Sequence, residues 1–262
     1  MIRNPLALRL DPERPVREQI QESARLGARG VVVDAIGDLA PHRLGETGRR
    51  EVRHILRSVE LKLAAVSLPT RRPFDTTDLL DDRLKRADAA CAMAFELGTD
   101  VVLVRVGSLP PEDDARRPIF TDAVRELARR ADHRGVRLAV ETGTESGTTL
   151  RAFLASLGVP ALAASLDPSA MLQAGLDPVA ATRELGAEWV AHAYAADATS
   201  ASRIAAPNPR GHGFPPGALD WEEYLGALEE IGYHNFLTVW PPAGRTAAAH
   251  FAAIVARLNE LG

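Results

Sequence analysis

Short apolar runs recur along the chain, each bounded by polar residues or glycine. Six of these runs come shortly after a glycine that follows leucine, isoleucine or arginine, and they cover residues 30–34, 101–105, 136–141, 161–167, 189–194 and 236–240. Glycine adopts the left-handed conformation that ends a helix at little cost, so these glycines indicate turns from a helix into a strand. Residues 6–10 and 61–68 also fit strands. Almost unbroken apolar runs are typical of a parallel sheet that is covered on both faces.

The segments between the runs carry apolar residues at helical spacing. Val16, Ile20 and Leu26 mark the first of these segments, and Phe251 and Ile254 lie in the last. The pattern gives eight strands alternating with eight helices, about 25–40 residues apart, as in βα units. Eight units favour a closed barrel over an open sheet, and no strand is followed by a Gly-x-Gly-x-x-Gly motif. We therefore predict an α/β fold, a single (β/α)₈ TIM barrel domain over residues 1–262.

Composition and charge exclude several classes of function. The chain has 262 residues, of which 46% are hydrophobic, and a formal net charge of −4. Mild acidity gives no electrostatic argument for binding nucleic acid or an anionic membrane. The single cysteine, Cys91, excludes an internal disulfide and a thiolate zinc cluster. No stretch is long enough to span a bilayer, and the first ten residues lack the apolar segment of a signal peptide. We therefore expect a cytoplasmic protein.

Polar residues close almost every predicted strand. In barrels of this type the chemistry lies where strands end and the following loops begin, so these residues are the candidates for a site. They are Arg9, Asp34, Ser67, Arg105, Glu141, Asp167, His192 with Tyr194, and Trp240.

Glu141 and Asp167 close two adjacent predicted strands. Because side chains alternate along a strand, Glu141 should point inward with Ala139, and Asp167 with Ser165 and Ala163. The two carboxylates could bind a divalent cation or act as an acid/base pair. The alternative is structural: Asp167 caps the helix that begins at Pro168, and Glu141 pairs with an arginine.

His192 and Tyr194 share one parity on the seventh predicted strand, so both should point into the barrel. His192 could be a ligand or a proton carrier, although a barrel histidine is also commonly just hydrogen-bonded. His212 lies in a glycine-flanked loop and could contact a substrate. Trp240 could stack on a sugar ring or plug the barrel. Arg105 could bind an anionic group or pair with Glu141.

Three segments together resemble the xylose isomerase-like TIM barrels, a family of sugar phosphate isomerases and epimerases. They are Leu138-Ala-Val-Glu-Thr-Gly143, Leu166-Asp-Pro-Ser-Ala-Met171, and Gly211-His-Gly213 followed by Leu219-Asp-Trp-Glu-Glu-Tyr-Leu. The resemblance covers nearly the whole chain. It implies a rim site that moves a proton beside a sugar carbonyl, by aldose–ketose isomerisation or epimerisation.

The resemblance also implies one divalent metal, such as Mn²⁺, Mg²⁺, Co²⁺ or Zn²⁺, held by residues from strands five to eight. Glu141 matches the glutamate of strand five and Asp167 the aspartate of strand six. Tyr194 stands where strand seven usually has histidine, with His192 one inward position deeper, and Trp240 stands where strand eight usually has glutamate. The implied ligands are thus Glu141, Asp167 and His192, and a metal held by this reduced set would be weakly bound or absent.

Two functions compete at this stage. The first is an isomerase or epimerase in which Glu141 and His192 are catalytic, and Arg105, Tyr194, His212 and Trp240 bind the substrate. The second is a barrel that has lost the metal and binds a carbohydrate without turnover. A lyase or dehydratase acting on an inositol-like compound is a third option within the family, whereas endonuclease IV-like DNA repair is excluded because its multi-zinc site needs more histidine and acidic residues. We expect a small sugar or polyol as partner, no nucleic acid and no membrane, with a homo-oligomer left open.

Overall fold

Eight parallel strands form a closed barrel in chain order, with β1 paired to both β2 and β8. The computed structural model describes residues 4–196, 219–241 and 246–261. The strands are β1 (Leu6–Arg9), β2 (Gly30–Asp34), β3 (Lys62–Leu68), β4 (Val101–Val104), β5 (Arg137–Glu141), β6 (Leu162–Leu166), β7 (Val190–Tyr194) and β8 (Leu237–Val239). The predicted (β/α)₈ TIM barrel is therefore confirmed.

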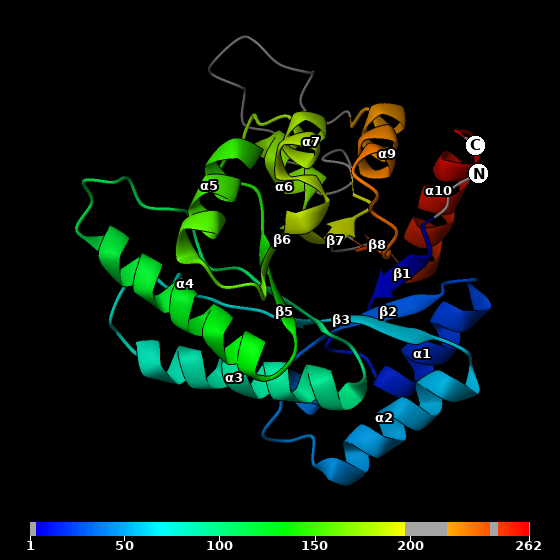
Figure 1. The fold of residues 1–262 in the computed structure, drawn as a ribbon. Coiled ribbons are helices and arrows are strands. Elements are labelled where there is room, and N and C mark those ends of the chain that lie inside the picture. The colour runs from blue at the N-terminus through cyan, green and yellow to red at the C-terminus, as the bar shows by residue number, and fades with distance from the viewer. Residues whose placement is uncertain (1–3, 197–218, 242–245, 262) are drawn as a thin grey trace.

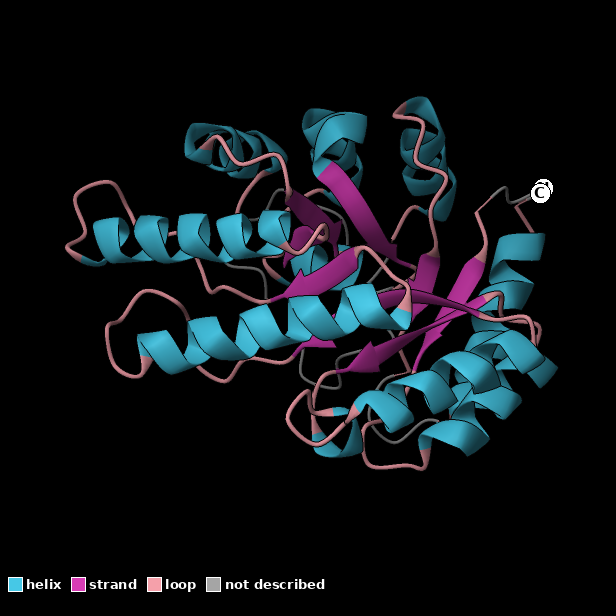
Figure 2. Ribbon diagram, turned by 60° about the horizontal axis from the view of Figure 1, so that its bottom comes forward, coloured by secondary structure: helices cyan, strands magenta, loops and turns pink. Residues whose placement is uncertain are grey.

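Helices cover the outside of the barrel (Figures 1 and 2). In the described residues they are α1 (Val16–Arg25), α2 (Glu46–Ser58), α3 (Leu80–Leu97), α4 (Arg116–His133), α5 (Gly147–Leu157), α6 (Pro168–Gln173), α7 (Pro178–Trp189), α9 (Trp221–Glu230) and α10 (Ala247–Asn259), with a short 3₁₀ helix at Gly37–Leu39. Gly98 and Gly158 follow α3 and α5 with φ of 95° and 64°, as predicted for glycines that end helices. Among the helices of these described ranges, none combines the length and the apolar character needed to cross a membrane.

The interior of the barrel is built largely from small side chains. Inward-facing alanines such as Ala7, Ala139 and Ala163 are fully buried, together with Val32 and Leu103. Barrels of this type are usually filled by bulky branched residues. Alanine at these positions leaves room for larger polar side chains at the carboxyl ends of the strands.

The boundaries of β6 and β7 differ from the predicted ones. Strand β6 ends at Leu166 instead of Asp167, because Pro168 has no N–H to continue the ladder and occupies the first turn of α6. Two helices, α6 and α7, lie between β6 and β7 where the pattern predicted one. Trp189 ends α7 instead of beginning the strand, and the kink in that helix lies at Gly186, with φ of 71°.

Candidate functional site

A cavity of about 1210 Å³ opens at the carboxyl ends of the strands. Residues from at or just beyond the ends of six strands line it: Arg9, Arg105, Glu141, Asp167, Tyr194 and Trp240. The structure thus brings these six candidate residues together at one cavity, whereas Asp34, Ser67 and the deeper His192 do not line it, and His212 lies outside the described residues.

The guanidinium of Arg9 lies at the centre of this end of the barrel. Its Nε donates a hydrogen bond to Asp34 Oδ1 at 3.0 Å, and Nη2 lies 2.9 Å from the same oxygen. Nη2 also donates to Ser67 Oγ at 2.8 Å, and Nη1 donates to the hydroxyl of Tyr194 at 2.7 Å. Although burial alone would lower the pKa of Arg9, the neighbouring Tyr194, Asp34 and Glu141 raise it. The group is therefore a permanent buried cation.

Trp240 covers the guanidinium. The Arg9 carbon Cζ lies 3.9 Å from the centre of the Trp240 ring, which is a cation–π geometry. The centres of the Tyr194 and Trp240 rings are 5.8 Å apart. Trp240 nevertheless remains 41% exposed. One part of the indole therefore packs on Arg9 while another part stays free at the cavity.

Glu141 is fixed between two arginines and a tyrosine. The hydroxyl of Tyr194 donates to Glu141 Oε1 at 3.3 Å, and Nη1 of Arg9 lies 3.8 Å from the same oxygen. Nε of Arg105 donates to Oε2 at 3.2 Å. The Glu141 side chain is only 8% exposed, whereas that of Arg105 is 59% exposed. Two positive groups thus stabilise the negative charge of a carboxylate that lines the cavity.

Asp167 caps α6 and faces the same cavity. Its Oδ1 accepts the backbone N–H of Ala170 at 3.1 Å, and its own backbone N–H donates to Thr142 Oγ1 at 2.9 Å. Burial raises the pKa of Asp167, the hydrogen bond from Ala170 lowers it, and the charge of Glu141 raises it further, with a net shift upward. The structural interpretation of Asp167 as a helix cap is confirmed, whereas its chemical role as a ligand or as part of an acid/base pair stays a prediction.

The loop after β5 packs closely against α6, and only glycine fits at position 143 of this loop. Gly143 has φ of 141°, and a Cβ added there would lie 2.8 Å from Cβ of Ala170. This close approach keeps the loop that follows Glu141 against the helix capped by Asp167.

His192 lies one layer below the cavity. Its Nδ1 is 2.8 Å from Ser165 Oγ and its Nε2 is 2.7 Å from Thr238 Oγ1, and its ring packs edge-on against Tyr194 at 4.6 Å. Burial, and next the charge of Arg9, lower the pKa of His192 to about 3. The role of His192 as ligand or catalytic group stays a prediction, and it would require one of these hydrogen bonds to be given up.

The side chains present do not fit the metal that the resemblance implies. Within the described ranges, no cluster of three or more histidine, cysteine, aspartate or glutamate residues could hold a metal ion. Of the implied ligands, Glu141 is bound to arginines, His192 is bound to two hydroxyls, and Asp167 accepts the backbone N–H of Ala170. At the end of β8, where the resemblance implies a glutamate, the ring of Trp240 packs on Arg9.

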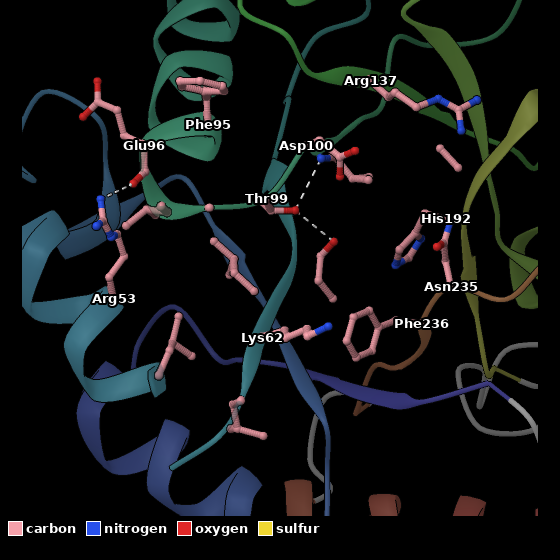
Figure 3. Close-up of a pocket in the computed structure, with 18 of the residues that line it drawn as sticks. Arg53, Lys62, Phe95, Glu96, Thr99, Asp100, Arg137, His192, Asn235 and Phe236 are labelled. Carbon is pink, nitrogen blue, oxygen red and sulfur yellow. Dashed lines mark hydrogen bonds between the residues drawn. The ribbon is translucent and has the colours of Figure 1, made fainter. Parts of the chain in front are cut away.

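A second cavity, of about 600 Å³, lies at the opposite end of the barrel (Figure 3). Lys62, Asp100 and Arg137, at the amino ends of three strands, line it together with Phe236, and His192 lies at its inner side. These charged groups are spread around the space instead of converging on one point. We therefore place the candidate site at the carboxyl ends, where two carboxyl groups share a cavity.

Sequence reasoning missed the central position of Arg9 and its pairing with Asp34. Both were recognised as strand-end residues, but only closure of the barrel brings them to Tyr194 and Trp240. The available signal was the parity of Arg9, two positions after the inward-facing Ala7. His250 on α10 also lines the cavity, although its position on a helix gave no reason to select it.

Comparison with known proteins points to one family. Residues 20–258 match the sequence model of the xylose isomerase-like TIM barrels. No curated protein matches the chain. A xylose isomerase domain protein from Planctomyces limnophilus superposes with a TM-score of 0.81 at 18% identity, over 98% of this chain and 96% of that one.

Two further solved structures are similar in fold. An L-ribulose 3-epimerase superposes with a TM-score of 0.77 at 14% identity, over 98% of this chain and 94% of that one. A probable 3-DHS dehydratase, AsbF, from Bacillus anthracis superposes with a TM-score of 0.74 at 16% identity, over 97% and 98%. At these identities the likeness shows the fold, and the chemistry has to be argued from the cavity itself.

Proposed function

The chain belongs to the xylose isomerase-like TIM barrel family, and on this premise we propose that it is a sugar isomerase or epimerase that moves a proton beside a carbonyl group. The observation that carries the proposal is the pair of carboxyl groups at the cavity. Glu141 pairs with two arginines, whereas burial raises the pKa of Asp167. Two neighbouring carboxyl groups with such different surroundings suit the roles of base and acid.

In the proposed reaction, Glu141 takes the proton from the carbon next to the carbonyl. The electron pair of that C–H bond forms a C=C bond, the carbonyl oxygen becomes the enediol oxygen, and Asp167 supplies the proton that this oxygen gains. For an isomer, Glu141 returns its proton to the former carbonyl carbon, and the hydroxyl of the carbon that first lost its proton gives its O–H proton to Asp167 and becomes the new carbonyl. For an epimer, the enediol oxygen returns its proton to Asp167, a water on the opposite face protonates the original carbon, and Glu141 releases its proton to solvent. The exposed part of Trp240 offers an apolar surface for the sugar ring.

Exchange of the carbon-bound proton with solvent tests this proposal. The protein is incubated in D₂O with a panel of aldoses, ketoses and their phosphates, and deuterium incorporation is measured by mass spectrometry. Glu141→Gln should lower the exchange rate by about 10²–10⁴-fold, because the base is lost while the shape is kept. Glu51→Gln is the control, since Glu51 lies on α2 and forms an exposed ion pair with Arg17. Exchange that is equally fast in Glu141→Gln would contradict the assignment.

A carbohydrate-binding barrel without turnover is the second candidate, and Trp240 favours it. Its ring closes on Arg9 and still presents a free surface, which suits stacking on a sugar. In that case the panel produces no exchange, while one sugar quenches tryptophan fluorescence in the wild type and in Glu141→Gln but not in Trp240→Ala. A product that has lost one water would instead indicate dehydration by the same base.

A further inference from the structure

Arg9 contacts residues on or just beyond five other strands of the barrel. From β1 its guanidinium contacts Asp34 of β2, Ser67 of β3 and Tyr194 of β7, lies near Glu141 of β5, and stacks on Trp240 just beyond β8. The Arg9 side chain is only 5% exposed. It therefore occupies the middle of the carboxyl end of the barrel, the position from which one cation can face several strands at once.

The oxygen atoms that a metal ion would need are already hydrogen-bonded. Asp34 Oδ1 accepts from Nε of Arg9 and lies 2.9 Å from Nη2 of the same group. Glu141 Oε1 accepts from Tyr194, and Glu141 Oε2 accepts from Arg105. Divalent cations prefer several carboxylate or carbonyl oxygens that they can draw inward together. Here any such ion would have to displace guanidinium groups from Asp34 and from Glu141.

The charges of the four ion-paired groups at this end of the barrel also balance without a metal. Arg9 and Arg105 carry two positive charges, and Asp34 and Glu141 carry two negative charges. A divalent ion placed among them would lie close to a fixed, poorly solvated positive charge, where Coulomb repulsion is weakly screened. At the end of β8 the ring of Trp240 covers the guanidinium and offers no oxygen ligand.

We infer that Arg9 is the resident cation of this site: its guanidinium takes the place of a divalent metal, excludes such an ion, and positions Glu141 and the Tyr194 hydroxyl toward the cavity. The inference uses the cavity of the proposed function but does not depend on the substrate. Arg9 acts through Tyr194 and Glu141, so it is a positioning residue. The hydroxyl of Tyr194 accepts from Arg9 and donates to Glu141, which links the buried charge to the reacting carboxylate.

Binding of Mn²⁺ in the absence of any sugar tests the inference. Wild type, Arg9→Lys, Trp240→Glu, Arg9→Gln and the double variant Arg9→Gln with Trp240→Glu are incubated with millimolar Mn²⁺. Metal retained after gel filtration and the change in melting temperature are then measured. The wild type, Arg9→Lys and Trp240→Glu should retain no stoichiometric Mn²⁺ and show no shift, because each keeps a cation at position 9. The double variant should bind Mn²⁺ about tenfold or more tightly than the wild type, because it removes the charge and adds a carboxylate.

Each result decides the question. Stoichiometric Mn²⁺ in the wild type that is lost in Glu141→Gln would overturn the inference, as would tight binding in Trp240→Glu while Arg9 is present. Mn²⁺ binding in the double variant that is no tighter than in the wild type would also overturn it, because metal exclusion would then have another cause. If the variants that remove Arg9 do not fold, Trp240→Glu and the wild type still provide the test, since Trp240 is partly exposed. Failure to find a sugar substrate would leave these measurements unaffected.

Discussion

The guanidinium of Arg9 and the carboxylate of Asp34 form an ion pair in which both side chains are buried. Removing one partner of such a pair leaves the other charged group without compensation in a poorly solvated place. Arg9→Met should therefore lower the free energy of unfolding by about 3–5 kcal/mol, measured by urea denaturation. Arg9→Lys should lose less, because it keeps the positive charge.

An exposed ion pair provides the control for Arg9. Arg183 pairs with Glu223 and Glu230 on the surface, where water and salt screen the charges. Arg183→Met should change the stability little. Equal losses in Arg9→Met and Arg183→Met would show that the central position of Arg9 has no special energetic weight.

His192 should make the protein sensitive to acid. Burial lowers its pKa from 6.5 in the unfolded chain to about 3 in the folded protein. The folded state then binds fewer protons than the unfolded state between these values, so its stability is present above about pH 6.5 and falls as the pH decreases toward 3. His192→Gln should reduce the slope of the unfolding free energy against pH in this range. The reduction should be at most about 1.4 kcal/mol per pH unit, which corresponds to one proton.

The measurement for His192 is a series of urea denaturation curves between pH 7.5 and pH 4. His54→Gln is the matched substitution, since His54 is exposed on α2. Its curves should have the slope of the wild type. A His192→Gln protein with the same pH slope as the wild type would show that the buried ring takes up a proton without penalty.

At the scale of elements, α6 allows the two roles of Asp167 to be separated. Asp167→Asn keeps an oxygen that can accept the N–H of Ala170, so the helix cap and the stability should be retained. The same change removes the acidic proton that Asp167 would donate, so exchange of the carbon-bound proton of the substrate with solvent should become about 10²-fold slower or more. Asp167→Ala should also lose about 1 kcal/mol of stability, measured by thermal denaturation.

Asp177 is the matched control for the cap, because its side chain accepts the N–H groups of Val179 and Ala180 at the start of α7. Asp177→Asn should preserve both stability and exchange. If Asp167→Asn also preserved exchange, Asp167 would be a helix cap alone.

The loop between β5 and α5 depends on Gly143. A methyl group there would meet Cβ of Ala170 at 2.8 Å, and φ of 141° strains any other residue. Gly143→Ala should therefore lower the melting temperature and weaken exchange, because the loop must move away from α6. Gly226→Ala on α9 is the control: nothing lies within 4 Å, and alanine favours the helix, so stability should rise by about 0.5–1 kcal/mol.

At the scale of the whole molecule, the repeated pattern of glycine and apolar run was sufficient to predict the barrel. Each of the eight predicted runs contains one observed strand. The ends were less predictable, as Asp167 shows, because the run of apolar residues continues through Leu166 while the cap and Pro168 already belong to the next helix. Such a boundary depends on whether a residue joins the hydrogen bonds of the strand or caps the next helix, and the hydrophobic pattern alone does not distinguish the two.

For the candidate site, the sequence could indicate which residues lie there but not how they contact one another. Parity along single strands correctly selected Glu141, Asp167 and Tyr194 as residues at the mouth. It placed His192 on the inner face, but its hydrogen bonds to Ser165 and Thr238 depend on the registers between strands. The partners of Arg9 depend on closure of the barrel, which no local pattern contains.

The hydrogen bond between Arg9 and Tyr194 joins residues 185 positions apart in the chain. Strand β1 pairs with β8 in the closed barrel, so the full set of contacts around Arg9 requires the two ends of the chain to come together, a long-range step that we expect to be slow. Trp240, which covers Arg9, lies directly after β8. In a variant that keeps Trp240 as its one tryptophan, fluorescence should therefore report closure of the barrel around Arg9, and a chain that stops short of β8 should lack the cover over this cation.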